Sequence, residues 1–550
     1  MEKQYSFSDK KILIVDGQRS YQTLLKTMLE NFGATHIFSA NSGESALHAC
    51  QKQFFDIFLV TYSLGNGKNG AQLLEELREN NCIDPASLYF IISGDNNREI
   101  VLNALETEPD DFLTKPFSQK QLKTRITKAY QKRQELLPVY IALAEKQYER
   151  AIEACKEYLH QSSRCQILCH SLIIESYIQL KDYKNAREHL LEFASTLQQS
   201  WCQTTLGRIE YLLGNYAHAI EMLQVVINNH PLVLNAYVTL ALSYRDSGQL
   251  KHALDIIQKA NDLSPLSLNR QQITAELALE SHHYALTRNT FGKILQLTRQ
   301  SFHKSPGHLC NFIRSLIDEA HNESDLYRKN RLLQEVNAVL FKARLEEGAI
   351  QDFDFDAFEG LSQARIFIVK GERLQAKRVL FSTNEQYLEA PTQVSNALLP
   401  DTYLTLHNIG EYEYAFIFAE ELKKRDQIDR FALKAVHDIA ENPEHQSTLE
   451  NIRHLNQLGI IAYGCQDYIK ARQYFKKALK LTPGNIELTL NKIQAIIRNL
   501  ESKDKLPPNE LEECKLDIRS ISGLKLNKTN TLRLKSLSSE FQALFRQNES

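Results

Sequence analysis

Four alanines recur along the chain at a nearly constant interval, and this period constrains the fold more than any other feature of the sequence. Ala151, Ala186, Ala219 and Ala253 are separated by 35, 33 and 34 residues, and each follows a tyrosine or a leucine by three residues. A small side chain lets two helices approach closely, while the larger side chain fills the next groove. A period of about 34 residues therefore predicts stacked pairs of antiparallel helices.

The pattern continues further along the chain and resembles the tetratricopeptide repeat family. Residues 455–483 are the best copy, whereas 300–358 and 420–450 match weakly. The resemblance covers most of residues 135–500 and implies an all-α superhelical array that binds proteins. The small residues expected at its helix–helix contacts are Ala151, Ala186, Gly207, Ala219, Ala241 (where other copies carry glycine), Ala253, Gly459 and Ala471.

The first 128 residues follow a different rule, because short apolar runs alternate with amphipathic segments. The runs predict strands at 11–15, 35–39, 56–60, 88–92 and 111–113. Helices are predicted at 24–29, 43–51, 71–80, 97–105 and 117–128. Five such units predict a parallel, doubly wound sheet with helices on both faces. Ligands of these sheets bind at the carboxyl ends of the strands, which directs attention to Asp16, Thr61, Ser93 and Lys115.

Four motifs that end strands resemble the receiver domain of bacterial two-component response regulators. They lie in order at 12–16, 55–56, 91–94 and 110–117. In that family, two acidic residues after the first strand and an aspartate ending the third strand hold Mg²⁺, and this aspartate accepts the phosphate. The resemblance gives Ser93 and Lys115 the role of binding phosphoryl oxygens and makes Phe112 the switch aromatic. It also implies a cis bond between Lys115 and Pro116.

Two departures from the family pattern bear on the chemistry. The acidic pair is reduced to Asp16 and Gly17, and the phosphoacceptor position holds Thr61. Asp56 lies five residues upstream, about 16 Å away along a strand. Mg²⁺ is held mainly through carboxylates, so we expect its binding to be weak or absent. Threonine is a weak nucleophile, and the sequence suggests no base to activate it.

Three interpretations of this pocket stay open at the sequence level. The favoured one is a degenerate, vestigial pocket in a domain kept for docking, with Lys115 paired to Asp16. In the second, the domain is fixed in an active-like or an inactive-like state, with Ser93 and Phe112 deciding which. The third retains phosphoryl chemistry. The sequence does not say whether Thr61 is modified.

Composition narrows the partners. With 65 Lys and Arg against 67 Asp and Glu, the balanced charge gives no reason to expect nucleic acid, and no apolar run is long enough to predict membrane insertion. The charged start of the chain does not resemble a signal peptide, and the nine scattered cysteines favour reduced thiols, which predicts a cytoplasmic protein. Cys165 and Cys169, with His170 beside them, lie one helical turn apart, but no second ligand pair follows, so helix packing is favoured over a metal site.

The predicted plan has a receiver-like domain at 1–128, repeats at 129–300 and 359–500, a divergent helical segment at 301–358, and a linker with a capping helix at 501–550. Residues 352–358 alternate acidic and aromatic side chains. They are interpreted as a turn with buried phenylalanines, with a site for a basic partner as the alternative.

These features predict a protein without enzymatic activity and without a cofactor. The favoured function is a signalling adaptor or scaffold that binds partner proteins, such as a kinase, a regulator or a target peptide; small-molecule ligands are not expected. The alternative is a phosphorylation-responsive regulator in a phosphorelay, with the repeats as its output. The sequence does not identify the partner, the pathway or the oligomeric state.

Overall fold

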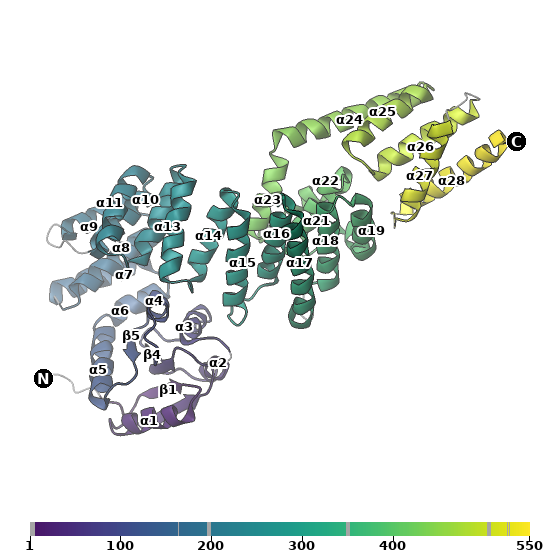
Figure 1. Cartoon of the computed structure of the whole chain (residues 1–550). Helices are drawn as coiled ribbons and strands as arrows, with labels where there is room; N and C mark the ends of the chain where they lie inside the picture. Colours follow the sequence, from purple (N-terminus) through teal and green to yellow (C-terminus); the bar gives the residue numbers. More distant parts are fainter. Residues whose placement is uncertain are drawn as a thin grey trace. The chain divides into compact units, whose positions relative to one another are not determined.

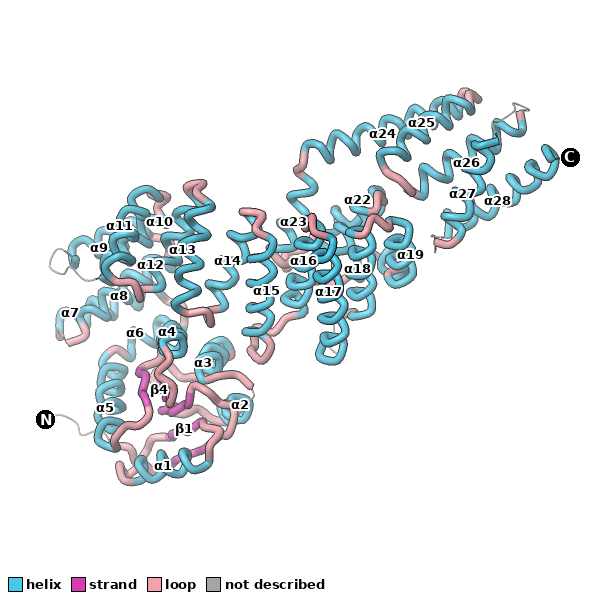
Figure 2. Tube along the Cα trace, in the orientation of Figure 1, coloured by secondary structure: helices cyan, strands magenta, loops and turns pink. Residues whose placement is uncertain are grey.

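The computed structural model describes residues 6–65, 67–162, 164–194, 200–347, 353–502, 508–524, 526 and 528–549. The chain divides into two compact units, Met1–Lys304 and Ser305–Ser550. The first unit contains a β-sheet domain followed by helical hairpins, and in the described part of the second unit every regular element is a helix (Figures 1 and 2).

The N-terminal domain is a five-stranded parallel sheet with the order β2-β1-β3-β4-β5, which confirms the predicted fold class. Its strands are β1 (Lys11–Val15), β2 (His36–Ala40), β3 (Ile57–Thr61), β4 (Leu88–Ser93) and β5 (Asp111–Thr114). Its helices are α1 (Arg19–Glu30), α2 (Gly43–Cys50), α3 (Gly70–Glu79), α4 (Arg98–Glu106) and α5 (Gln119–Glu135).

Alternating side chains of the central strands supply two separate cores. Leu13 and Phe58 face a core that α2, α3 and α4 cover, whereas Ile14 and Leu59 face a core that α1 and α5 cover. A strand directs successive side chains to opposite faces, so a sheet covered on both sides needs the continuous apolar runs seen in the sequence.

Ten helices complete the first unit as five successive hairpins. They are α6 (Leu137–Ala144), α7 (Tyr148–Gln161), α8 (Gln166–Gln179), α9 (Tyr183–Ala194), α10 (Ser200–Leu212), α11 (Tyr216–Asn229), α12 (Leu234–Asp246), α13 (Leu250–Leu263), α14 (Leu268–Glu280) and α15 (Tyr284–Thr298). The helix α6 begins two residues after α5 ends, so the sheet domain passes into the repeats without a linker.

The corner inside each hairpin has a left-handed backbone. Gly214 and Gly248 have φ values of +82° and +81° there, which glycine adopts without strain. Lys146, Lys181 and His282 have φ between +52° and +58° at the matching corners. Glycine therefore marks only some of the corners in the sequence, although the geometry is shared.

The recurring small residues lie at tight helix contacts. Ala151, Ala186, Ala219, Ala241, Ala253 and Ala471 are all buried. A Cβ atom at Gly207 would lie 2.6 Å from Leu223 Cγ, and one at Gly459 would lie 2.5 Å from Phe475 Cε1. These distances are too short for a Cβ atom, so only the hydrogen atom of glycine fits where the paired helices approach each other this closely.

The second unit is built from α16 (Pro306–Asn322), α17 (Leu326–Glu347), α18 (Phe355–Val369), α19 (Arg373–Thr383), α20 (Glu385–Glu389), the 3₁₀ turn η1 (Pro391–Gln393), α21 (Leu399–Asn408), α22 (Tyr412–Leu422), α23 (Arg430–Ala440), α24 (Pro443–Gly464), α25 (Tyr468–Leu481), α26 (Ile486–Glu501), α27 (Pro508–Ser522) and α28 (Lys528–Glu549). Among the described residues, none of these helices is both long and apolar enough to cross a membrane.

The acidic and aromatic stretch falls at the start of α18. Phe353, Phe355 and Phe358 are buried and pack against one another. Asp354 caps the helix by accepting a hydrogen bond from Ala357 N–H, while Asp352 lies outside the described residues. Burial of all three rings supports the interpretation as packing rather than an exposed site.

Candidate functional site

The carboxyl ends of the strands bring the predicted receiver residues to one edge of the sheet. Thr61 ends β3 and Ser93 ends β4, whereas Asp16 follows β1 and Lys115 follows β5. Because β1 and β3 are neighbours in the sheet, Asp16 lies beside Thr61. Only 2% of Asp16 and 9% of Thr61 is exposed, so the site is a small polar cluster enclosed by an apolar sheet.

Three of these side chains contact one another directly. The Thr61 hydroxyl donates a hydrogen bond to Asp16 Oδ2, and Lys115 Nζ lies 3.0 Å from the same oxygen. Lys115 Nζ is also 3.4 Å from Thr61 Oγ1. The other carboxylate oxygen of Asp16 accepts a hydrogen bond of 2.7 Å from Gln18 N–H. Both oxygens of the only carboxylate in this cluster are thus engaged by groups of the chain itself.

Two residues that the sequence analysis did not single out complete the cluster. Lys115 Nζ lies 3.4 Å from the centroid of the Tyr21 ring, within the range of a cation–π contact. Burial, together with the neighbouring Asp16 carboxylate, raises the pKa of Tyr21 to about 12. Gln22 donates hydrogen bonds to Asp16 O at 2.6 Å and Ala40 O at 3.1 Å, which fixes the backbone that carries Asp16.

Ser93 and Phe112 lie outside this contact network. The Ser93 hydroxyl donates to Asp95 O at 2.8 Å and accepts from Asp95 N–H at 3.1 Å, so its hydrogen bonds serve the local turn. Phe112 pairs with Ile91 across β4 and β5 and is partly buried against the core under α3 and α4. The bond between Lys115 and Pro116 is cis.

The donors present at this edge do not fit a resident Mg²⁺ ion. Mg²⁺ requires near-octahedral oxygen ligands and is usually held by more than one acidic or phosphate group. Asp16 supplies the one carboxylate, and a lysine ammonium lies against it. A Cβ atom at Gly17 would lie 3.6 Å from Leu64 O, an ordinary contact, so a side chain could stand there without steric conflict. The fold therefore leaves room for a side chain at position 17, and the second acid is missing only because the residue there is glycine.

Asp56 cannot replace the missing carboxylates. It precedes β3, at the opposite end of the strand from Thr61. Its carboxylate accepts a hydrogen bond of 2.9 Å from Lys11 N–H and pairs with Lys10 Nζ at 3.2 Å. These contacts tie β1 to β3 at the edge of the sheet remote from the cluster.

The structure corrects one inference from the sequence, because a potential base does lie beside Thr61. The Asp16 carboxylate accepts the hydrogen bond of the Thr61 hydroxyl. The sequence alone does not reveal this base, because residues 16 and 61 come together only through the pairing of β1 with β3. This carboxylate is shared with Lys115 and Gln18 N–H, so it is not reserved for the hydroxyl.

The cysteine and histidine cluster in the repeats has contacts of another kind. Cys169 is buried in the hydrophobic core of the first two hairpins. His170 Nδ1 lies 2.9 Å from His189 Nε2, and its ring stacks on Phe193 at 3.9 Å between centroids. Within the described part of the chain, no group of three or more ligating side chains could hold a metal ion.

The sheet domain also contacts the repeats of the first unit. Arg270, at the start of α14, is 2% exposed and forms a two-pronged ion pair with Glu106 at the end of α4. Its NH2 group also donates to Ser264 O at 2.6 Å. Leu102 of α4 packs against the core of α11 to α14, and Gln72 of α3 donates to Leu297 O at 3.1 Å. No local pattern could reveal this contact, because its partners lie far apart in sequence.

Comparison with known proteins agrees with this geometry. Residues 12–127 match the response regulator receiver domain. They form a receiver-like domain, which is called the receiver below. Residues 234–265 and 455–485 match tetratricopeptide repeats, which correspond to α12–α13 and to the end of α24 with α25.

Three curated relatives each resemble less than a quarter of this chain. PhoP of Bacillus subtilis, an alkaline phosphatase synthesis transcriptional regulatory protein, is 32% identical over 128 residues, covering 23% of this chain and 51% of PhoP. ZraR of Escherichia coli K12, a transcriptional regulatory protein, is 30% identical over 118 residues, covering 22% of this chain and 26% of ZraR. The chemotaxis protein CheY of Pseudomonas aeruginosa is 28% identical over 122 residues, covering 22% of this chain and 97% of CheY. The chain thus spans about half the length of PhoP and about a quarter of ZraR.

Two solved structures each match less than a third of this chain. A two-component response regulator from Clostridium difficile is 26% identical, with a TM-score of 0.21, covering 22% of this chain and 97% of that one. A double mutant of MamA RS-1 is 20% identical, with a TM-score of 0.26, covering 29% of this chain and 90% of its own.

Proposed function

We propose that this protein is a non-enzymatic signalling adaptor or scaffold of the two-component type, which binds partner proteins without aspartyl phosphorylation. The observation that carries the proposal is Thr61 at the acceptor position, where it donates to Asp16 beside Lys115. The negative charge of Asp16 is thus compensated by Lys115. An acyl phosphate requires a carboxylate at position 61, and a hydroxyl offers only a slower ester-forming route.

The loss of the acidic pair removes the second requirement of phosphotransfer. Without a carboxylate at Gly17, Asp16 alone would have to hold the divalent ion that neutralises the phosphodonor. Lys115 already neutralises Asp16 at 3.0 Å, so a cation would have to displace it. We therefore expect Mg²⁺ to bind weakly or not at all.

The two modules support a role in protein binding. A tetratricopeptide array presents an extended surface of stacked hairpins, which is the usual basis of partner recognition in solenoid proteins. Receiver relatives carry the names of transcriptional and chemotaxis proteins, which connects the domain to signalling. The proposed partners are a signalling kinase, a regulator or a target peptide.

Phosphate incorporation tests the proposal. The full chain is incubated with Mg²⁺ and acetyl phosphate, and intact-mass spectrometry is used to detect an added phosphoryl group. We expect no mass increase on the receiver. A phosphoryl group mapped to a residue of the strand-end cluster would contradict the proposal.

The Gly17→Asp/Thr61→Asp double variant is the matched positive control. It restores three carboxylates at the edge where Gly17 leaves room for a side chain. We expect it to bind Mg²⁺ at least tenfold more tightly than the natural chain, measured by calorimetry. If the affinity does not rise, Thr61 does not occupy the acceptor position.

The alternative is a phosphorylation-responsive regulator whose repeats are the output. The contact of α4 with the repeats favours it, because a change in the receiver could reach the array through Glu106 and Arg270. The same phosphorylation assay separates the two functions.

A further inference from the structure

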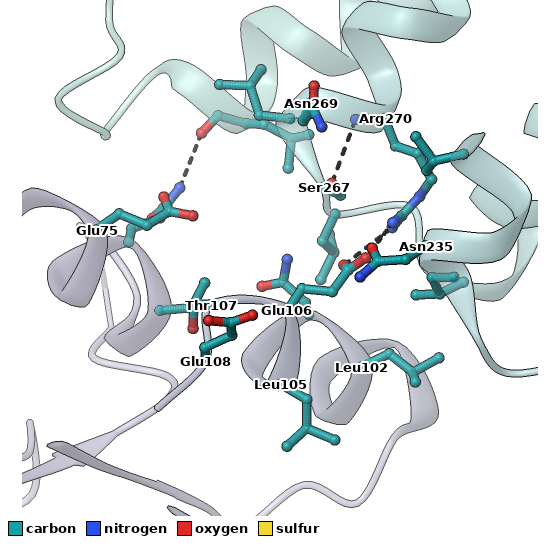
Figure 3. Close-up of a pocket in the computed structure, with 18 of the residues that line it drawn as sticks. Glu75, Leu102, Leu105, Glu106, Thr107, Glu108, Asn235, Ser267, Asn269 and Arg270 are labelled. Carbon is teal, nitrogen blue, oxygen red and sulfur yellow. Dashed lines mark hydrogen bonds and ion pairs between the residues drawn. The ribbon is translucent and has the colours of Figure 1, made fainter. Parts of the chain in front are cut away.

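A cavity of about 740 Å³ lies between the receiver and the repeats of the first unit (Figure 3). The receiver contributes α3 and α4, and the repeats contribute the starts of α12 and α14 with the end of α15. This volume is in the range of sites for small organic ligands, which often lie between domains. No pattern in the sequence predicts such a ligand, and the cavity is the observation that argues for one.

The lining of the cavity carries more negative than positive charge. Glu75, Glu106 and Glu108 contribute three carboxylates, and Arg270 contributes one guanidinium. Because Arg270 is paired with Glu106, its charge is already compensated. Figure 3 shows Glu75 on the opposite side of the cavity from this ion pair. An excess of carboxylates favours a cationic ligand.

Glu75 is the carboxylate that most needs a partner. It is half-buried, and in the described part of the chain its carboxylate has neither a hydrogen bond nor an ion pair. The nearby guanidinium of Arg78 is directed to backbone oxygens, at 2.6 Å from Thr107 O and 2.8 Å from Glu108 O. Burial raises the pKa of Glu75, although Arg78 opposes the shift. An ionised carboxylate left in this position destabilises the free protein.

Apolar side chains also line the cavity. Leu102, Leu105 and Leu266 are among them. An aliphatic part of a ligand could pack against these side chains.

We propose that the cavity binds a small organic amine, whose ammonium group pairs with Glu75. Its aliphatic part packs against Leu102 and Leu105. Amines with a branched aliphatic side chain combine these two features. The inference goes beyond the proposed adaptor function, since it adds a small-molecule input to the receiver–repeat contact.

Calorimetry on the full chain with two probes tests the proposal. L-leucinamide carries the ammonium and an aliphatic side chain, whereas 4-methylpentanamide keeps the aliphatic chain and lacks the amino group. We expect L-leucinamide to bind and the neutral probe to bind at least tenfold more weakly. Failure of L-leucinamide to bind, or equal affinity for the two probes, would overturn the proposal.

Glu75→Gln provides a second readout that does not depend on the probe. The neutral amide should weaken L-leucinamide binding at least tenfold and raise the thermal midpoint of the ligand-free protein by about 1–3 °C. The control is Glu79→Gln, one turn further along α3 at an exposed position, which should change neither quantity. Unchanged binding, or a lower midpoint, in Glu75→Gln would contradict the assignment of Glu75 as the ammonium site.

Discussion

At the scale of single residues, Asp16 is the centre of the receiver pocket. Its carboxylate and backbone oxygens accept hydrogen bonds from Thr61, Gln18 and Gln22, and Lys115 supplies the compensating charge. A buried carboxylate that loses its cation keeps its desolvation cost, and this makes Lys115 a structural residue whatever else it does.

Lys115→Met should therefore destabilise the receiver by about 1–3 kcal/mol, since Asp16 is left buried and unpaired. The measurement is urea unfolding of the full chain, followed by fluorescence and circular dichroism. Lys26→Met is the control, because Lys26 and Glu30 form an exposed pair at 3.9 Å and its loss should cost less than about 0.5 kcal/mol. Equal stability of Lys115→Met and the natural chain would show that Asp16 needs no counter-ion.

Close approach of helices can also be tested one residue at a time. Gly459→Ala would place a Cβ atom 2.5 Å from the ring of Phe475, which is itself buried, and should cost about 1–3 kcal/mol. Gly464→Ala, in the same helix α24, has no atom within 4 Å of the new Cβ and should be neutral or stabilising by up to about 1 kcal/mol. Chemical denaturation of the two variants in parallel gives the comparison.

The residues of the site were only partly predictable. Asp16, Thr61 and Lys115 could be found because each ends or follows an apolar strand, and parallel strands end at a common edge. Tyr21 and Gln22 could not, since helical periodicity describes which face of α1 is buried but not which polar atom its side chains reach. Ser93 was assigned from a motif, and its hydroxyl bonds to Asp95 within its own turn.

At the scale of elements, strands and hairpins followed from local patterns. The strands predicted at 35–39 and 111–113 lie at His36–Ala40 and Asp111–Thr114. Hairpin corners with glycine were visible, whereas those at Lys146 and His282 depend on tertiary packing to hold a left-handed lysine or histidine. The structure divides into two units after Lys304, and the predicted domain boundaries, including the one at 300, stay predictions.

One helix pair of the second unit should respond to pH. A hydrogen bond with Glu487, followed by burial, raises the pKa of Glu413 to about 8. A carboxyl whose pKa is higher in the folded state binds more protons there than in the unfolded chain, so its contribution to stability falls as pH rises from about 4.5 to about 8. Denaturation midpoints across this range should fall less steeply for Glu413→Gln. The control is Glu420→Gln, a partly exposed residue on the same helix whose carboxylate pairs with Lys423 at 2.7 Å, and it should keep the natural slope.

At the scale of the whole molecule, the described contacts make the receiver part of the first unit. Its end continues into α6, and its helix α4 contacts the starts of α12 and α14. Neither this contact nor the cavity could be predicted from the sequence. Glu106 and Arg270 form an ion pair although they lie far apart in the chain, and no sequence pattern links the two positions.

Charge reversal tests this contact. Glu106→Arg or Arg270→Glu should each place like charges together and increase deuterium exchange in α4 and α14, by about tenfold or more in the least stable amides. The double variant Glu106→Arg/Arg270→Glu restores opposite charges and should recover most of the protection. If the single variants exchange like the natural chain, the ion pair does not hold the receiver to the repeats.

The two attachments of the receiver have a mechanical consequence for the hairpins between them. A free solenoid bends and frays because each repeat contacts only its neighbours. Here the stretch from α6 to α14 is closed into a loop, joined covalently at α6 and by the buried Glu106–Arg270 pair at α14. We therefore expect the receiver to act as a brace across this loop and to limit how far the hairpins between α6 and α14 can bend.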